Sequence, residues 1–514
     1  MIDKNYSFQD IPATWVSCSL GDLAIYIQRG KSPKYVKKSA LPVINQKSLR
    51  WDRLIREYFK YIAAEQQPFW EEDRYIKVND IIWNSTGTGT VGRAYRVKET
   101  DIDCPKVVDS HVTIVRMHAD ICSRYAHFWI SGPYVQQQIG EMCDGSTNQI
   151  ELSRSTISET QIPLPPLPEQ HRIVAKIEEL FSELDKGVEA LKTAQQQLKV
   201  YRQAVLKWAF EGKLTEEWRR RQKNLPTAER LLEQIKTQRE KEIKATGKKR
   251  KPVAELTKKD LAKMPTLPEG WLWTKLDYIG ELGRGKSKHR PRNDKRLFGG
   301  PYPFVQTGEI KAVKEVVKSY GNTYSEFGLS QSKLWPKGTL CITIAANIAE
   351  AAFLGFDSCF PDSVVGFSPN ANLTMSKFIF LFFRGNQRTI EEFAPATAQK
   401  NINLNILENL NIPYCSHKEQ NRVVQEIESR LSVADKIEEA ITQSLKQAEA
   451  LRQSILKKAF SGKLVPQDPN DEPAEKLLAR IRAEKAAQSA VKGTTKRKGA
   501  GRRVASSRNV AGRP

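Results

Sequence analysis

The sequence predicts an α+β fold: two similar mixed α/β domains joined by two long antiparallel coiled-coil helices, with pseudo-two-fold symmetry. Two observations lead to this prediction. Residues 162–214 recur as residues 412–464 without a gap, at a constant offset of 250, and shorter anchor motifs in front of each copy recur as well. A chain in which one long element is repeated is built from two modules. At 514 residues the chain is also too long for a single hydrophobic core.

The order of the segments follows from this repeat. We expect a first mixed domain at 1–165, a central long helix at 166–215, a short helix and charged linker at 216–265, a second mixed domain at 266–415, a second long helix at 416–465, a short closing helix at 466–487 and a basic, disordered tail at 488–514.

Both mixed domains contain the same anchors in the same order. The matched pairs are Pro12-x-x-Trp15 with Pro268-x-x-Trp271, Leu20 with Leu276, Arg29-Gly30-Lys31-Ser32 with Arg284-Gly285-Lys286-Ser287, Pro42-Val43-Ile44-Asn45 with Pro303-Phe304-Val305-Gln306, and Asp109-Ser110 with Asp362-Ser363. Runs of β-branched and aromatic residues predict strands, and helical stretches are expected near 125–140 and 375–393. Between the anchors the two domains share little, which indicates one scaffold used to read two different things.

The two repeated segments are predicted to be long helices. A proline-rich strap, 162–168, leads into the first, and Ser416 and Glu419 have capping-box spacing at the start of the second. Gly212 and Gly462 supply the C-terminal stops. About 42 residues at ~1.5 Å per residue give a rod of roughly 60 Å.

Apolar residues recur on both segments with heptad spacing. The rows are Ile177, Leu184, Leu191, Leu198 and Val205 beside Ile173, Leu180, Gly187, Ala194, Tyr201 and Trp208 on the first helix, and Ile427, Ala434, Ile441, Ala448 and Ile455 beside Val423, Ile437 and Leu451 on the second. Large residues on one helix and small ones on the other favour packing of the two together. Packing of each on its own domain or on a separate subunit is the alternative.

A short amphipathic helix is predicted after each long one, at 228–235 and 474–481, because both segments read Ala-Glu-x-Leu-Leu-x-x-Ile. The apolar face of such a helix can dock a partner or pack on the long helices. The pattern does not distinguish these two uses.

The composition indicates an anionic partner. The chain has 82 Lys and Arg against 59 Asp and Glu, a formal net charge of +23. No apolar run approaches the ~18 residues of a membrane span, so nucleic acid is favoured over a membrane. The seven cysteines are scattered without a Cys-x-x-Cys or Cys/His cluster, which indicates neither a zinc site nor a disulfide framework and fits a reducing, intracellular setting.

Three short motifs imitate sites of catalysis. Gly280-x-x-x-x-Gly285-Lys286-Ser287 has phosphate-loop spacing, but the residues after it, 288–293, will not open a helix. Gly87-x-Gly89-x-x-Gly92 leads into a strand-like run, whereas a dinucleotide fingerprint opens a helix. The segment 411–414, Asn-Ile-Pro-Tyr, has the wrong second residue for an adenine-methyltransferase signature. We therefore predict no catalytic residue, no metal and no cofactor in this chain.

The repeated segments resemble a known family. The strap Ile-Pro-Leu-Pro-Pro-Leu-Pro-Glu-Gln-x-Arg at 162–172, the helix ends Arg-Gln-x-x-Leu-Lys-x-Ala-Phe-x-Gly-Lys-Leu at 202–214 and 452–464, and the doubled layout resemble the specificity subunit of Type I restriction–modification systems. The resemblance covers about Pro12 to Ala487. The second strap, 413–417, departs from the proline run, and the basic tail looks like an extension.

The resemblance implies a sequence-specific DNA-recognition subunit without chemistry of its own. Two target-recognition domains would each read one half of a bipartite duplex-DNA site, with the spacing set by the helices. Two methylation (M) subunits and restriction (R) subunits would be its partners in the cytoplasm. Adenine-N6 methylation and ATP-dependent cleavage, with S-adenosylmethionine, ATP and Mg, would belong to those partners.

Polar and basic loop residues are the candidates for contact with DNA, although an ordinary solvated loop has the same composition. The candidates are Arg29, Lys31, Arg284, Lys286, Lys288 and Arg290 for phosphates, Ser85, Thr86 and Thr88 for the DNA backbone, and Thr147, Asn148, Gln149, Gln399, Lys400 and Asn401 for base edges.

Two other functions remain open. A stand-alone P-loop ATPase or methyltransferase would bind nucleotide or S-adenosylmethionine as the purified chain. A non-specific nucleic-acid-binding assembly protein would bind all duplexes with equal affinity.

Overall fold

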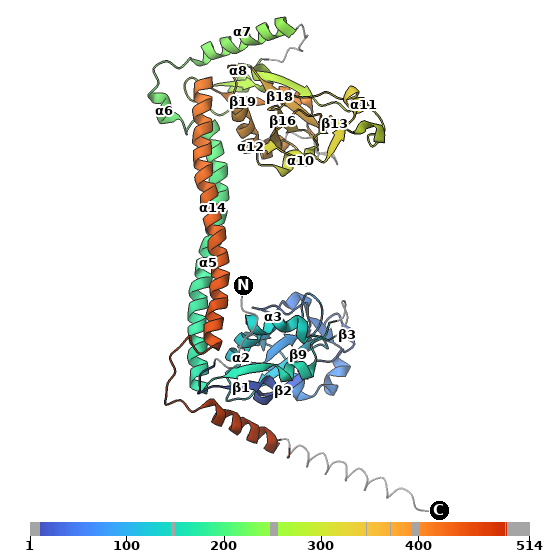
Figure 1. Ribbon diagram of the computed structural model, residues 1–514, viewed down its shortest axis with the longest axis vertical. Helices are drawn as coiled ribbons and strands as arrows, with labels where there is room; N and C mark the ends of the chain where they lie inside the picture. The colour runs from blue at the N-terminus through green and yellow to red at the C-terminus, as the bar shows by residue number, and fades with distance from the viewer. Residues whose placement is uncertain are drawn as a thin grey trace, which may run out of the picture. The chain divides into compact units, whose positions relative to one another are not determined.

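The chain divides into two compact units (Figure 1). A computed structural model describes residues 11–144, 150–246, 255–345, 347–370, 372–392, 401–488 and 490. The first unit comprises Met1–Leu191 and Gln443–Pro514, and the second comprises Lys192–Thr442. Each unit therefore holds one mixed α/β domain, the beginning of one long helix and the end of the other.

The first unit is built on a four-stranded antiparallel sheet in the order β2-β9-β6-β7. Its strands are β2 (Ala24–Arg29), β9 (Val112–Met117), β6 (Ile81–Asn84) and β7 (Ala94–Arg96). A second sheet, β3-β5-β4-β8, includes the parallel pair of β4 and β8. Its strands are β3 (Tyr35–Val36), β5 (Lys60–Ile62), β4 (Pro42–Ile44) and β8 (Val107–Val108).

A separate strand pair brings the two ends of this domain together, because β1 (Val16–Ser19) lies antiparallel to β10 (Gln161–Leu164). The helices are α1 (Leu20–Leu23), α2 (Ser123–Ile130), α3 (Pro133–Met142) and α4 (Arg154–Glu159), with 3-10 turns at Arg56–Tyr58, Ala64–Phe69, Glu72–Arg74 and Glu99–Asp101. The stretch expected near 125–140 is thus two helices. They break at Gly132, where a Cβ would lie 2.9 Å from the Phe128 carbonyl oxygen, and Pro133 begins the next helix.

The second unit repeats the main sheet. The order is β12-β18-β16-β17-β14, in which only β14 is parallel to its neighbour. The strands are β12 (Gly280–Arg284), β18 (Val364–Pro369), β16 (Leu340–Thr343), β17 (Ala351–Leu354) and β14 (Val316–Val317), with the pairs β11 (Leu272–Lys275)–β19 (Asn411–Tyr414) and β13 (Phe298–Phe304)–β15 (Asn322–Tyr324). The helices are α6 (Glu216–Arg220), α7 (Ala228–Thr246), α8 (Lys258–Leu261), α9 (Leu276–Ile279), α10 (Thr307–Ala312), α11 (Glu326–Ser330), α12 (Ser376–Glu392) and α13 (Leu404–Glu408), with a 3-10 turn at Lys295–Leu297.

The two domains share their scaffold and differ in one insert. Strands β2, β9, β6 and β7 correspond in order and direction to β12, β18, β16 and β17. The segment between the first and second of these strands along the chain is residues 30–80 in one unit and 285–339 in the other. It contributes strands to a four-stranded second sheet in the first unit, and a two-strand ribbon, α10, α11 and β14 in the second. The divergence seen in the sequence is therefore concentrated in this insert.

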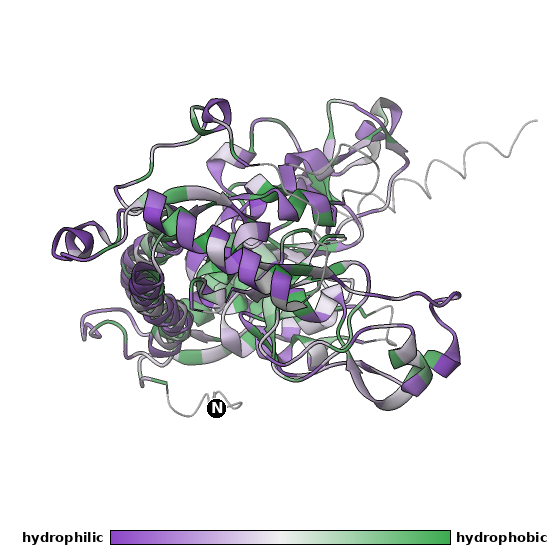
Figure 2. Ribbon diagram, turned by 90° about the horizontal axis from the view of Figure 1, so that it is seen from above, coloured by the Kyte–Doolittle hydropathy of each residue, from purple (hydrophilic) through white to green (hydrophobic). Residues whose placement is uncertain are grey.

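The repeated segments are the two long helices α5 (Leu167–Phe210) and α14 (His417–Phe460), each of 44 residues. Each ends before a glycine in the left-handed region, Gly212 at φ +70° and Gly462 at φ +68°, as a C-terminal stop requires. In each unit the two helices run side by side in opposite directions (Figure 1). Most of their residues are hydrophilic (Figure 2).

Equivalent residues of the two helices exchange partners between the units. In the first unit Asp185 of α5 pairs with Arg452 of α14. In the second unit Arg202 of α5 pairs with Asp435 of α14 at 2.6 Å. Asp435 and Arg452 are the repeats of Asp185 and Arg202 at the 250-residue offset. One ion pair is therefore formed twice, with the roles of the helices reversed.

The same exchange occurs at the helix ends. Phe460, the last residue of α14, packs edge-on against Tyr125 and Trp129 of α2, with ring centroids 5.4 and 4.9 Å apart. Its repeat, Phe210 at the end of α5, packs against Phe378 and Phe382 of α12 at 5.0 and 5.3 Å. Each domain is thus completed by the end of the helix that starts in the other unit.

The start of each long helix is fixed by a buried glutamine. Gln170 accepts a hydrogen bond from the Cys122 amide and donates one to the Pro165 carbonyl, at 2.9 and 3.0 Å. Gln420 repeats this with the Met375 amide at 2.8 Å and the Cys415 carbonyl at 2.9 Å. Both glutamines are fully buried. The Glu-Gln dipeptide in each repeat therefore ties the strap to the domain helix beside it.

Most residues of the main heptad rows are buried, but Leu184, Leu191 and Ala448 are only half-buried, and the second rows are inside only in part. Ile177, Leu198 and Val205 on α5 are buried, and so are Ile427, Ala434, Ile441 and Ile455 on α14. Trp208, Ile437 and Leu451 were expected on the seam but are 40%, 46% and 51% exposed. Near Trp208 the helix turns other residues inward, because Val205, Leu206, Ala209 and Phe210 enter the core of the second domain.

The apolar faces of the short helices are occupied by the domains of their own units. On α7, Leu231 and Ile235 are buried in the second domain, and Arg239 pairs with Asp277 of α9 at 2.5 Å. The closing helix, residues 474–488, buries Leu477 and Ile481 in the core of the first domain. Both cores also contain residues of the long helices, so the expected packing of these faces within the chain is met, and docking of a partner on them stays a prediction. Among the described helices none is both long and apolar enough to cross a membrane.

Shortening Phe460 to alanine should lower the free energy of unfolding by about 3–5 kcal/mol, because this fully buried ring fills the core of the first domain. The control is Val200→Ala on the exposed face of α5, where the side chain is 69% exposed. It should change stability by less than about 0.5 kcal/mol. Chemical denaturation measures both. Equal, small effects would contradict the insertion of the helix end into the domain.

Candidate nucleic-acid interface

A glycine turn follows the first strand of the main sheet in each unit. A Cβ on Gly30 would lie 2.0 Å from the Val108 carbonyl oxygen, and one on Gly285 would lie 2.2 Å from the Pro361 carbonyl oxygen. The Gly30 amide donates to Val112 at 3.0 Å, and the Gly285 amide donates to its equivalent, Val364, at 2.9 Å. The repeated Arg-Gly-Lys-Ser motif is therefore a structural turn in which only glycine fits.

The arginines before these turns hold the turn in place. Arg29 donates to the Ser110 carbonyl and pairs with Glu151. Arg284 donates through Nε to the Asp362 carbonyl at 2.5 Å. Burial lowers the pKa of Arg29. These contacts also correct one anchor: Ser110 corresponds to Asp362, so the expected match of Asp109-Ser110 with Asp362-Ser363 is shifted by one residue.

The loop between β6 and β7 carries the polar candidates of the first unit. Thr88 is exposed, and Thr86 contacts His111 Nδ1 through its hydroxyl at 2.7 Å. Ser85, however, is fully buried and bonds Thr113 Oγ1 at 2.6 Å. The expectation that Ser85 contacts the DNA backbone is therefore wrong for this structure. A serine that follows a strand cannot be told from a loop serine by composition alone.

The loop between β16 and β17 is the equivalent place in the second unit. The Leu152 amide donates to Ser85 at 2.7 Å, and the Ile402 amide donates to Ile344 at 3.0 Å. Asn401, exposed beside this loop, forms a bridge with Ala345. The other base-edge candidates, Thr147, Asn148, Gln149, Gln399 and Lys400, lie outside the described residues.

The basic turn of the second unit carries three exposed cations. Lys286 and Lys288 are exposed. Arg290 is exposed too, but its guanidinium donates to the carbonyls of Ser287 and His289 at 2.6 and 2.8 Å, which stiffens the loop. The structure thus brings these three candidates together on one surface loop.

In the first unit Lys31 is exposed, with its Nζ 5.8 Å from the centre of the Trp70 ring. The sequence analysis missed three exposed lysines that follow the turn along the chain, Lys34, Lys37 and Lys38. These lysines have no counterpart in the second domain, so the sequence repeat did not identify them, and they contributed only to the net charge. Both glycine turns therefore carry exposed cations, placed by different local sequence.

The three motifs that resemble catalytic or cofactor-binding sites in the sequence form structural elements. Gly280 to Arg284 form strand β12, and no helix opens after Ser287. The glycines at 87–92 lie in the hairpin between β6 and β7, and Tyr414 is fully buried beside β11. Burial also raises the pKa of the Cys18 thiol to about 12, which disfavours a thiolate. Among the described residues no three His, Cys, Asp or Glu gather as a metal site.

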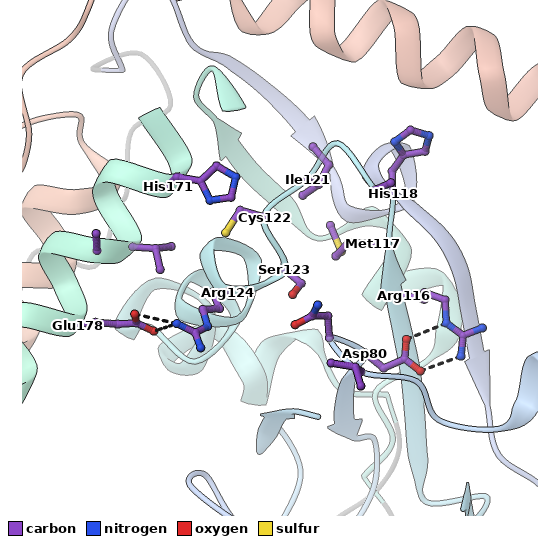
Figure 3. A pocket seen from close by; sticks show the side chains of 15 residues that line it. Asp80, Arg116, Met117, His118, Ile121, Cys122, Ser123, Arg124, His171 and Glu178 are labelled. Atoms are coloured by element: carbon purple, nitrogen blue, oxygen red, sulfur yellow. Dashed lines mark hydrogen bonds and ion pairs between the residues drawn. The ribbon is translucent and has the colours of Figure 1, made fainter. Parts of the chain in front are cut away.

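A pocket of about 570 Å³ lies between the main sheet, α2 and α5 of the first unit (Figure 3). Arg116 pairs with Asp80 at 2.7 Å, and Arg124 pairs with Glu178 at 2.6 Å. The charges of these ion pairs cancel within the wall of the pocket. This is the arrangement of a joint between the domain and the long helix, and it offers no excess positive charge to a nucleic acid.

Comparison with known proteins follows the two-unit division. The sequence profile of the Type I restriction modification DNA specificity domain matches residues 12–193 and residues 268–447. The EcoBI specificity subunit of Escherichia coli is 27% identical over 373 residues, which cover 67% of this chain and 69% of that protein. The EcoKI specificity subunit of Escherichia coli K12 is 23% identical over 510 residues, 95% of this chain and 99% of that protein.

Two solved structures share the fold at 16% sequence identity. One, from a study of complex assembly and conformational transition in the type I R-M system, has a TM-score of 0.63 and covers 90% of this chain and 100% of its own. The other, the HsdS subunit from Thermoanaerobacter tengcongensis, has a TM-score of 0.55 and covers 88% and 98%. With two copies of the specificity domain on one repeated scaffold, this chain belongs to the Type I restriction–modification DNA specificity family.

Proposed function

We propose that the chain reads a bipartite duplex-DNA target, with one half-site contacted by each unit. The observation that carries the proposal is one scaffold built twice with exchanged helix ends and with different inserts, in a chain of the DNA specificity family. A common scaffold would present each insert to DNA in the same way. Different inserts would then select different bases.

Phosphate contacts would set the position of each unit on the duplex, and base edges would give its specificity. For phosphates we propose Lys31, Lys286, Lys288 and Arg290, which are exposed on the two glycine turns. Arg29 and Arg284 would act mainly by holding those turns, since both bond carbonyl groups. Thr86, Thr88 and Asn401, with Thr147, Asn148, Gln149, Gln399 and Lys400, remain candidates for DNA backbone or base contacts.

The chain would act with other subunits. We propose that two methylation subunits bind along α5 and α14 and methylate adenine N6 with S-adenosylmethionine. Restriction subunits would add ATP- and Mg-dependent cleavage, and all of these would work on DNA in the cytoplasm. The specificity chain itself would supply recognition and assembly, consistent with glycine motifs that form a turn and a hairpin.

Mapping modified adenines in DNA from cells that express this chain with its partners tests the function directly. One split motif with an unread gap is expected. Equal affinity of the purified chain for all duplexes would contradict the proposal in favour of a non-specific binder, and tight binding of ATP or S-adenosylmethionine by the chain alone would favour an enzyme.

Neutralising Lys286 and Lys288 with glutamine should weaken binding to every duplex and reduce the slope of log K against log salt by about 2, one unit for each lost phosphate contact. The matched control is Lys258→Gln with Lys259→Gln on α8, exposed lysines of the same unit. Fluorescence titration at several salt concentrations gives both slopes. Identical slopes for the two variants would remove the turn from the interface.

Exchanging residues 12–161 for the equivalent region of a relative should change one half of the methylated motif and leave the other half unchanged, because the exchanged region lies wholly within the first unit. Sequencing of methylated adenines measures the result. A change in both halves would refute independent reading by the two units.

Inserting seven residues in register into both α5 and α14 should lengthen the unread gap, because ~7 residues add about 10 Å to a helix and B-DNA rises ~3.4 Å per base pair. The expected change is roughly three base pairs, read from the same methylation map. An unchanged gap would show that the helices do not set the spacing.

A further inference from the structure

An exposed tryptophan stands at the tip of a short hairpin in the insert of the first unit. Leu49 bridges Leu54, and the Arg50 amide donates to the Arg53 carbonyl at 3.1 Å, which closes a tight turn over residues 51 and 52. Trp51 at this tip is 44% exposed. The closed turn presents the indole to solvent, where its flat apolar face is available for contact.

The base of this hairpin is rigid. Asn45 and Ser48 are buried and bond each other twice, from the Asn45 amide to Ser48 Oγ at 2.9 Å and from Ser48 Oγ to the Asn45 carbonyl at 2.8 Å. Asn45 Nδ2 also donates to the Tyr58 carbonyl at 2.6 Å. Leu49 is fully buried in the core. The position of the tip is therefore set by the core beneath it.

The hairpin adjoins the candidate DNA surface and is positively charged. Gln46, just before it, accepts a hydrogen bond from Thr90 Oγ1 at 3.1 Å in the loop that carries Thr88. Lys47 and Arg53 are exposed, and Arg53 pairs with its neighbour Asp52 at 3.1 Å, so the one carboxylate at the tip is neutralised. The cations could contact the phosphates on either side of a groove, while the apolar tip contacts the bases inside it.

At the equivalent place the second unit has the short helix α10 instead of a hairpin. Its equivalent of Asn45 is Gln306, whose backbone amide donates a hydrogen bond to Glu309 Oε2 at 2.9 Å. Ile310, in the place of Leu49, is also buried, at 1% exposure. Counting on from these anchors, Lys311 stands where the first unit has Arg50, and an exposed alanine, Ala312, stands where it has Trp51. A hairpin tipped by Trp51 in the first unit thus corresponds to the end of a helix, at Ala312, in the second. A feature that only one of the two units has is suited to the selection of one half-site.

We propose that Trp51 is a specificity-determining residue of the first unit, and that its indole contacts base edges in the major groove of one half-site. The major groove is wide enough for a two-stranded ribbon, and apolar side chains there contact the thymine methyl group. Lys47, Arg50 and Arg53 would contact flanking phosphates. This inference rests on the proposed function and assigns part of the reading to a named side chain.

The test compares the wild-type chain, Trp51→Ala and Trp51→Phe on duplexes that carry the mapped target with single base pairs changed in either half. Trp51→Ala should bind the target roughly tenfold more weakly and lose discrimination at one or two base pairs of one half only. The salt slope should stay the same, because an indole releases no counterion. Trp51→Phe should restore part of the discrimination. Leu232→Ala, another exposed apolar residue, is the control and should change neither.

The outcomes separate this inference from the proposed function. A wild-type chain without sequence preference would overturn both. A wild-type chain that discriminates, with Trp51→Ala discriminating equally well in both halves, would overturn the role of Trp51 alone. Unchanged DNA discrimination with loss of co-purifying methylation subunits would overturn it too, and would make the hairpin a protein-docking site. An unchanged melting temperature would confirm that the variant is folded.

Discussion

The structure depends on an exchange of helix ends. Each long helix starts in one unit, where a buried glutamine ties it to the domain, and ends in the core of the other unit through Phe210 or Phe460. Neither domain has a complete core without the end of the helix that begins in the other. A helix of 44 residues is far longer than one domain requires. The exchange explains why it must be continuous.

The exchange also explains which parts of the sequence repeat. Gly212 lies against Pro268 and Gly462 lies against Pro12, so the stop of each helix packs on the anchor that opens the other domain. The main sheet, the glycine turns and the straps take part in these contacts or support them, and they recur. The inserts at 30–80 and 285–339 lie outside this framework. They are therefore free to differ, and reading two unlike half-sites requires that they do.

The framework could be predicted because it rests on local rules. Glycine stops, a proline strap and seven-residue spacing gave both long helices, and a short pattern gave α7 and the closing helix. The site was harder. Ser85 and Thr88 look alike in composition, but a strand bond places one inside and a turn places the other outside. Trp208 has the heptad spacing of a buried residue but is exposed, because its neighbours on the helix pack into the domain core. Trp51 has no sequence signature, since its exposure depends on a hairpin closed by residues 49 and 54.

Distances between spin labels on the two long helices test the exchange most directly. Labels would be attached at Asp185→Cys with Arg452→Cys, and separately at Arg202→Cys with Asp435→Cys, after the partly exposed cysteines Cys104, Cys122 and Cys143 are replaced by serine. Both pairs should report one short distance within a single chain, near the ~8–10 Å separation of packed helices plus the label arms. A short distance in only one pair, or one seen only between chains, would contradict the account.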